Sequence, residues 1–362
     1  RDESLEVQTR RAVEMGLAEH PGDVLVFLPG QREIMRVETM LQEVAARDVI
    51  VLPLHGELSV EKQSEALQPD PQGRRRVVLA TNVAESSVTL PGVRVVIDSG
   101  LAREPSYDPN SGFSRLEVAN ISQASADQRA GRAGRVAEGW AYRLWPQSQR
   151  LDPQRRPEMA LVELAALALE LAAWGSDELR FVDTPPAGAL SAARDLLRRL
   201  GALTPANAIT ALGKRMLALG THPRLAAMLL CARDEVDRAL ACDLAALVEA
   251  RDPLRQGGDA LAARWRALAA FRNGRVPAEA NRSGLAAIDA AAKQWRRRLR
   301  TNASPPASIE AHRLGDVLMH AFPDRIGTQH PQDPRRSQSP NGPTARLSAD
   351  SAPSGEPWHV VS

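Results

Sequence analysis

Short, continuous apolar runs alternate with polar stretches over the first 145 residues of the chain. The runs lie at 24–28, 49–52, 77–80, 93–97 and 141–145, and they are rich in β-branched residues. Because each run is apolar at almost every position, the pattern predicts strands that are buried on both faces, as strands of parallel sheets are. The polar stretches between the runs fit helices that cover the two faces of the sheet. This part of the chain is therefore predicted to be an α/β domain.

A different pattern interrupts this alternation between Ile97 and Ser122. The segment REPSYDPNSGFSRLEV is polar, and its residues 108–112 (DPNSG) are all common in turns. Extended stretches flank this turn on both sides. The segment therefore predicts a hairpin that protrudes from the domain.

The composition changes after Pro157, where Ala, Leu and Arg dominate and apolar residues recur at helical spacing. The apolar residues of 159–173 share one face and stop before Gly175, which predicts a helix with a glycine at its C-terminus. The helices that bracket 201–210 are typical of a small winged-helix unit. Further helices are predicted near 189–200, 211–219, 224–250, 258–272, 283–300 and 308–321.

These changes of pattern divide the chain into five segments. We predict a connecting segment at 1–19, an α/β domain at 20–150, a winged-helix-like domain at 151–220 and a helical bundle at 221–327. Residues 328–362 are rich in Pro, Ser, Asn, Gly and Asp, which indicates a linker or the beginning of a further domain. The first residue is Arg1 rather than methionine, so the chain is expected to be an excerpt of a longer product.

Composition and charge narrow the class of protein. The 362 residues are 43% hydrophobic and 25% charged, which is typical of globular proteins, and Lys and Arg number 46 against 44 for Asp and Glu. Any attraction to phosphate must therefore come from local clusters of arginine. The two cysteines are too few for a disulfide framework. No apolar run is long enough for a membrane span, and no histidines have the paired spacing of metal ligands. A cytoplasmic protein without a metal site is expected.

The most specific pattern is QRAGRAGR at 128–135. Ser125 and Gln128 have capping-box spacing, which predicts that a helix begins here. On a helix, Arg132 and Arg135 lie on one face, with small residues between them that let a ligand approach. Two guanidinium groups beside the Gln128 amide suit a polyphosphate, because arginine donors are planar and always charged. A solvated basic helix is the alternative interpretation.

Residues 128–135 resemble motif VI of the DEAH-type superfamily-two helicases. Other segments are similar to parts of the same family in the same order: 25–34 (LVFLPGQREI) to motif IV, 52–59 (LPLHGELS) to the adjoining strand and turn, and 81–89 (TNVAESSVT) to motif V, which VIDSG follows at 96–100. The resemblance implies that 20–150 is the second RecA-like domain of a helicase. It also implies that winged-helix and helical-bundle domains follow this domain.

The resemblance implies a nucleotide-binding role for motif VI. Arg132 and Arg135 match positions that reach the γ-phosphate of ATP, and Gln128 matches a position that helps to place the attacking water. ATP and Mg²⁺ would be bound mainly by a preceding RecA-like domain of the same protein. An arginine that stabilises the transferred phosphoryl group is worth about 10³–10⁵ in rate, so both arginines are candidate catalytic residues.

The resemblance also implies a nucleic-acid-binding role for motifs IV and V. Gly30, Thr81, Asn82 and Thr89 match positions that hold the sugar-phosphate backbone of single-stranded RNA, with DNA as the alternative strand. Hydroxyl, amide and backbone N–H donors bind phosphates without recognising bases. Outside such a motif, the two threonines and the asparagine would be interpreted as turn and cap residues. A basic run at 295–298 (WRRR) is a further candidate for phosphate contact, and packing over neighbouring helices is its alternative interpretation.

Three functions remain open at this point. The first is the C-terminal part of an ATP-dependent RNA helicase. The sequence contains no Gly-x4-Gly-Lys-Ser/Thr phosphate loop and no DExH box at the end of an apolar strand, so this chain alone is not expected to hydrolyse ATP. The second is a non-catalytic nucleic-acid-binding or scaffolding module that has kept the helicase fold. The third, an α/β domain for a phosphorylated small molecule, does not explain why motifs IV, V and VI occur together.

Overall fold

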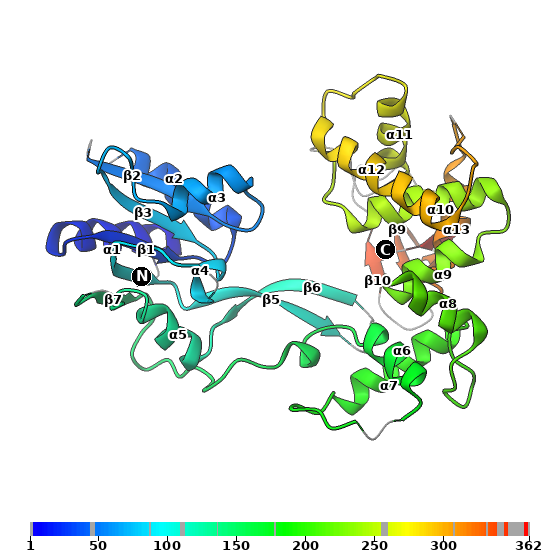
Figure 1. Cartoon of the computed structure of the whole chain (residues 1–362), viewed down its shortest axis with the longest axis horizontal. Helices are drawn as coiled ribbons and strands as arrows, with labels where there is room; N and C mark the ends of the chain where they lie inside the picture. Colours follow the sequence, from blue (N-terminus) through cyan, green and yellow to red (C-terminus); the bar gives the residue numbers. More distant parts are fainter. Residues whose placement is uncertain are drawn as a thin grey trace. The chain divides into compact units, whose positions relative to one another are not determined.

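The chain folds into two compact units (Figure 1). Unit 1 comprises Arg1–Ser106 and Ser114–Leu161, and unit 2 comprises Tyr107–Phe113 and Val162–Ser362. The computed structural model describes residues 3–43, 48–86, 88–108, 113–135, 137–176, 179–254, 260–306, 308–330, 332–338, 344–346 and 358–360.

A five-stranded sheet with the order β2-β3-β1-β4-β7 forms the centre of unit 1. Every neighbouring pair in it is parallel. The predicted apolar runs are these strands, with ends that differ by two residues at most, so the predicted parallel α/β domain is confirmed. The strands are β1 (Asp23–Phe27), β2 (Val49–Leu54), β3 (Arg75–Ala80), β4 (Val93–Asp98) and β7 (Trp140–Arg143).

Helices cover both faces of this sheet. Val24 and Val26 of β1 are buried against α1 (Leu5–Glu19) and α2 (Gln31–Gln42). Their neighbours Leu25 and Phe27 belong to the core on the opposite face, which α3 (Val60–Leu67) and α4 (Val83–Ser86) cover. Successive side chains of a strand point to opposite faces, so a sheet buried on both sides needs the continuous apolar runs that the sequence shows.

Residues 1–19 were predicted to be a connecting segment, and the structure corrects this prediction. Residues 5–19 of this segment form the whole of helix α1, whose N-cap Ser4 accepts a hydrogen bond from the Val7 N–H at 3.4 Å. Ala12 and Val13 of this helix are buried in the core of unit 1. The many charged residues of α1 lie beside a narrow apolar face, which is why the sequence pattern did not indicate a core helix.

The polar segment between β4 and α5 (Gln123–Ala130) forms two further strands. They are β5 (Leu101–Asp108) and β6 (Phe113–Asn120), and they pair with each other as a two-stranded sheet. This pairing fits the predicted hairpin. The predicted turn residues 109–112 lie outside the described residues.

Unit 2 is mainly helical, as predicted. The helix predicted at 159–173 begins only at Ala165, after a 3-10 turn η1 (Glu158–Ala160), and it is followed by Gly175 with a φ of 82°. The helix predicted at 224–250 is two helices, because Asp234 begins a new one by accepting the Asp237 N–H at 2.7 Å. The helices are α6 (Ala165–Trp174), α7 (Ala187–Arg199), α8 (Ala211–Leu219), α9 (Pro223–Cys231), α10 (Glu235–Glu249), α11 (Leu261–Arg272), α12 (Arg282–Leu299) and α13 (Ala311–Leu318).

The segment between α7 and α8 has the local pattern expected of a winged helix. Gly201 has a φ of 73°, and an isolated antiparallel bridge joins Leu203 to Ile209. Thr210 then begins α8 by accepting the Gly213 N–H at 2.9 Å. The boundaries of a winged-helix-like domain at 151–220 and a helical bundle at 221–327 remain predictions. In the described part of the chain, no helix has the length and apolar character needed to cross a membrane.

Residues 328–362 were predicted to be a linker or the beginning of a further domain. Their described parts contribute to a four-stranded sheet with the order β10-β9-β8-β11, in which each neighbouring pair is antiparallel. This sheet argues against a linker, and the beginning of a further domain remains a prediction. Backbone hydrogen bonds form this sheet although the residues are mostly polar, so no apolar alternation marked the strands in the sequence. The strands are β8 (Ile326–His330), β9 (Asp333–Gln338), β10 (Thr344–Arg346) and β11 (Trp358–Val360).

Candidate nucleotide and nucleic-acid site

The predicted site residues of unit 1 lie where the parallel strands end. Phe27, the last residue of β1, pairs with Ala80 in β3 and with Asp98 in β4. The segments that follow these residues, which include Gly30 and Thr81, therefore leave the sheet at the same edge. Ligands of open α/β sheets bind at this carboxyl edge.

Motif VI approaches this edge through helix α5. Ser122, rather than Ser125, is the N-cap, because its hydroxyl accepts the Ser125 N–H at 3.1 Å. The helix ends at Ala130, and the Arg132 N–H then donates to the Arg129 carbonyl at 3.0 Å in a tighter turn. The prediction that Arg132 and Arg135 project from one face of a helix is therefore wrong. The two glycines of QRAGRAGR favour a turn over further helix.

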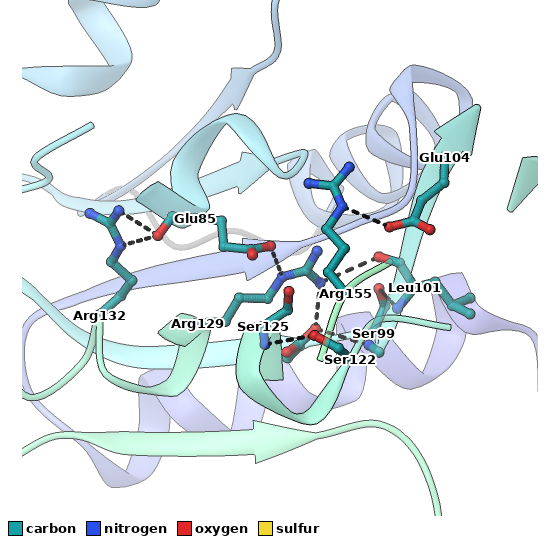
Figure 2. A network of polar contacts seen from close by, with 11 residues as sticks. Glu85, Ser99, Leu101, Glu104, Ser122, Ser125, Arg129, Arg132 and Arg155 are labelled. Atoms are coloured by element: carbon teal, nitrogen blue, oxygen red, sulfur yellow. Dashed lines mark hydrogen bonds and ion pairs between the residues drawn. The ribbon is translucent and has the colours of Figure 1, made fainter. Parts of the chain in front are cut away.

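Arg129 is the centre of a buried polar network (Figure 2). Only 1% of this residue is exposed, and its Nε donates to Glu85 Oε2 at 3.0 Å. One terminal nitrogen donates to Asp98 Oδ1 at 2.9 Å and to the Leu101 carbonyl at 3.3 Å. The guanidinium carbon also lies 4.7 Å from the centre of the Phe27 ring. Arg129 therefore joins motif VI to motif V and to the end of β4.

Asp98 is the buried anion of this network. Its Oδ1 accepts the Gly100 N–H at 2.9 Å in addition to the contact with Arg129. Its Oδ2 has no hydrogen-bond partner among the described residues. Burial raises the pKa of Asp98, and the opposing effect of the Arg129 charge does not cancel this rise.

Arg132 is also buried, with 4% of its surface exposed. Its Nε and one terminal nitrogen donate to the Glu85 carbonyl at 3.0 and 2.5 Å, and the other terminal nitrogen donates to the Val88 carbonyl. Both carbonyls belong to motif V. Burial lowers the pKa of Arg132, and the nearby charge of Arg135 lowers it further. In this geometry Arg132 holds the backbone of motif V.

Arg135 has different surroundings from Arg132. Its side chain is exposed, and it forms no ion pair with a described residue. Gln128, on the last turn of α5, is exposed as well. The structure therefore brings the two predicted arginines near each other but leaves only Arg135 oriented like a group that can meet an external phosphate.

Thr81 and Asn82 of motif V form the turn between β3 and α4, and Thr89 follows α4. The Thr81 N–H donates to the Leu54 carbonyl at 3.2 Å, and the Asn82 carbonyl accepts the Glu85 N–H at 3.0 Å. Thr81 is half-buried, whereas Asn82 and Thr89 are exposed. The backbone thus fixes the turn, and the predicted strand-binding side chains remain accessible.

Gly30 is the N-cap of α2, and Arg103 from β5 lies directly over it. A Cβ atom at Gly30 would be 2.5 Å from Arg103 Nε, so a larger residue would displace the arginine. One terminal nitrogen of Arg103 is 3.8 Å from Glu33 Oε2. The sequence interpretation missed both Arg103 and Arg129. Arg129 stands within motif VI itself, but no local pattern indicates that its side chain is buried.

The three arginines of the basic run at 295–298 have different surroundings. Arg296 donates to Asp243 Oδ1 at 2.7 Å, and Arg298 donates to the Ala218 carbonyl at 3.3 Å while it lies 5.5 Å from the Trp295 ring. Arg297 is exposed. Two of the three arginines therefore contact protein groups, which favours the packing interpretation of this run. Among the described residues, no group of three His, Cys, Asp or Glu side chains could hold a metal ion.

Comparison with known proteins agrees with the geometry of unit 1. Residues 8–137 match the family model described as the helicase conserved C-terminal domain. Over 350 residues the chain is 38% identical to the ATP-dependent RNA helicase HrpB of Escherichia coli (strain K12), which covers 95% of this chain and 40% of that protein. It is also 41% identical over 229 residues to the ATP-dependent RNA helicase DEAH11, chloroplastic, of Arabidopsis thaliana, a match that covers 61% of this chain and 13% of that one.

The solved structures extend this similarity to both units. The crystal structure of the Escherichia coli DEAH/RHA helicase HrpB matches with a TM-score of 0.84 and 35% identity, over 99% of this chain and 43% of that chain. The chain therefore contains a helicase conserved C-terminal domain at residues 8–137. HrpB of Escherichia coli is one relative that it resembles over nearly its whole length, and the chain spans about 40% of the length of that protein.

Proposed function

We propose that this chain is the C-terminal part of an ATP-dependent RNA helicase that couples ATP hydrolysis to movement along RNA or to its unwinding. The observation that carries this proposal is the anchoring of motif V by motif VI. Arg129 and Arg132 bind Glu85, while Arg135 stays exposed beside them. Binding or hydrolysis of ATP near Arg135 would therefore move the segment that carries the strand-binding residues.

Arg135 is the proposed contact to the γ-phosphate of ATP. Its charge would stabilise the oxygens of the transferred phosphoryl group, as arginine fingers do. Gln128, exposed on the preceding helical turn, would help to place the attacking water. Arg132 was predicted as a second phosphate contact, and in the described geometry it supports this role by binding the Glu85 and Val88 carbonyls. ATP and Mg²⁺ would be held mainly by a preceding RecA-like domain, and no residue of this chain is assigned to the ion.

Gly30, Thr81, Asn82 and Thr89 are the proposed contacts to a single strand. Asn82 and Thr89 are exposed, and Asn82 closely follows the end of β3, so their side chains can donate to phosphate oxygens. Such contacts bind a strand of any base sequence, because they are made to the backbone and not to the bases. RNA is the proposed strand because the curated relatives are named RNA helicases. A cytoplasmic place of action is part of the same proposal.

RNA-stimulated ATP turnover of the full-length natural protein tests this function. Replacing both Thr81 and Thr89 by alanine is expected to raise the concentration of oligouridine needed for half-maximal turnover at least about tenfold, with saturated turnover unchanged within about twofold. Thr39→Ala, at an exposed position of α2, is the matched control. A full-length protein without RNA-stimulated ATP turnover would contradict the proposal. The alternative function, a non-catalytic nucleic-acid-binding module, would then be favoured.

A further inference from the structure

A hollow of about 510 Å³ opens beside helix α11 in unit 2. Ala269 and Ile309, which are partly exposed, contribute apolar surface to its lining, with the buried Trp265 behind them, and none of the lining residues is acidic. A volume of this size falls within the range of pockets that hold small ligands, roughly 300–1,000 Å³. All of its lining residues belong to unit 2, and none of them is a motif residue of the function proposed above.

Two arginines give the hollow a positive rim. Arg266 and Arg275 both line it, and both are exposed. Neither forms an ion pair with a residue in the described part of the chain. Two other arginines of α11 are different, since Arg264 pairs with Asp252 and Arg272 pairs with Asp243. Arg266, on α11, and Arg275, just beyond its end, are thus the arginines of this segment that line the hollow without an ion-pair partner.

The end of α11 fixes the position of Arg275. Gly274 has a φ of 77°, and its N–H donates to the Phe271 carbonyl at 3.0 Å. The Arg275 N–H donates to the Ala270 carbonyl at 2.9 Å. This pair of bonds is the Schellman arrangement, which turns the chain back over the last helical turn. The backbone of Arg275 is therefore held beside the hollow.

A buried ion network fixes the apolar wall. Trp265 is 1% exposed, and its indole N–H donates to Asp243 Oδ2 at 3.2 Å. Asp243 is fully buried and also accepts two hydrogen bonds from Arg272 and one from Arg296, each at 2.7 Å. The tryptophan is therefore held in place without a ligand. Such preorganisation lowers the entropic cost of binding.

We infer that this hollow binds one nucleotide unit of single-stranded RNA, with the phosphate between Arg266 and Arg275 and the base against the apolar wall. Guanidinium groups match phosphate oxygens in geometry and charge, and an apolar wall accepts any base. This inference rests on the proposed function, since it adds a second strand contact to that of motif V. A free nucleotide carries the same chemistry, so the experiment includes it as a separate arm.

Fluorescence anisotropy with a labelled ten-nucleotide oligouridine tests the site in the full-length protein. Replacing both Arg266 and Arg275 by alanine is expected to weaken binding at least about tenfold. The salt dependence, expressed as the slope of log K against log salt, is expected to fall by about 0.7, because one phosphate contact with a single strand is lost and each such contact contributes about 0.7. The matched control replaces Arg282 and Arg297, which are exposed on α12 and do not line the hollow, and it is expected to stay within twofold of the wild type.

Equal losses in the two double variants would overturn the inference, since they would show only a general effect of charge. Photo-crosslinking of oligo-4-thiouridine gives a second measurement, and crosslinks are expected within residues 265–275 or at 308–309. Binding of uridine monophosphate that depends on Arg266 and Arg275, without any effect on the oligonucleotide, would identify a free nucleotide as the occupant and also overturn the inference. The Thr81 and Thr89 variants report on motif V alone, so failure at the hollow is distinguishable from failure of the proposed function.

Discussion

Arg129 and Asp98 form an ion pair inside unit 1, with a terminal nitrogen of Arg129 2.9 Å from Asp98 Oδ1 and with side chains that are 1% and 3% exposed. Arg129 stands in motif VI, and Asp98 ends the strand that follows motif V. The pair therefore fixes the position of the segment that carries Arg135. Because water does not reach either group, removal of one leaves the other charge buried without compensation.

Replacing Arg129 by alanine is therefore expected to lower the free energy of unfolding by about 3–5 kcal/mol. Urea unfolding monitored by circular dichroism measures this change. The control is Arg143→Ala, which breaks a pair with Asp127 whose side chains are 40% and 59% exposed and should cost less than about 1 kcal/mol. Equal costs for the two variants would show that the buried pair does not stabilise the unit.

Trp145 packs closely on Gly100, and a comparison with Gly73, which has nearly the same backbone conformation, tests this contact. Gly100 has a φ of 73°, and a Cβ atom there would lie 2.6 Å from Cε3 of Trp145. Gly73 has a φ of 72°, but a Cβ atom there would have no neighbour within 4 Å. Gly73→Ala should therefore cost about 1–2 kcal/mol from backbone strain, and Gly100→Ala about 1–3 kcal/mol more from the clash. Urea midpoints of the two variants test this difference, and similar values would contradict the packing of Trp145 on Gly100.

Asp70 is expected to make stability depend on pH in the acid range. The hydrogen bond from the Arg74 side chain lowers the pKa of Asp70 from 3.8 to about 2. Because the pKa is lower in the folded state, the carboxylate stabilises the fold above its unfolded pKa, and this contribution is lost as the pH falls from about 4 to about 2. The difference in stability between the wild type and Asp70→Asn should therefore be constant at neutral pH and shrink across this range. Urea unfolding at pH 7, 4 and 3 measures it, and a constant difference would refute the pairing.

The strands of unit 1 could be predicted because burial on both faces requires an apolar residue at nearly every position of a strand. Leu25 and Phe27 face one core while Val24 and Val26 face the other, so every position of β1 must be apolar. The strands after His330 show no such apolar pattern, because their pairing depends on backbone hydrogen bonds between mostly polar residues. The break before α10 had a signal in Asp234, which is a common N-cap residue, but the surrounding apolar periodicity concealed it.

The candidate site was predictable only in part. The positions of Gly30 and Thr81 follow from the end of an apolar strand, which the sequence shows. The burial of Arg129 does not, since its partners Glu85 and Asp98 are 44 and 31 residues away in the chain. The same is true of Arg132, whose acceptors are main-chain carbonyls that no side-chain pattern marks. Contacts of this kind become visible only when the fold brings distant segments together.

Single-turnover ATP hydrolysis by the full-length natural protein tests the central claim most directly. Arg135 is the exposed arginine of motif VI, and its replacement by alanine should lower the hydrolysis rate at least about a hundredfold, with RNA affinity retained within about twofold. Arg143→Ala, which removes another exposed arginine of unit 1, should leave the rate unchanged. A rate for Arg135→Ala within a factor of two of the wild type would contradict the assignment of Arg135 to the γ-phosphate.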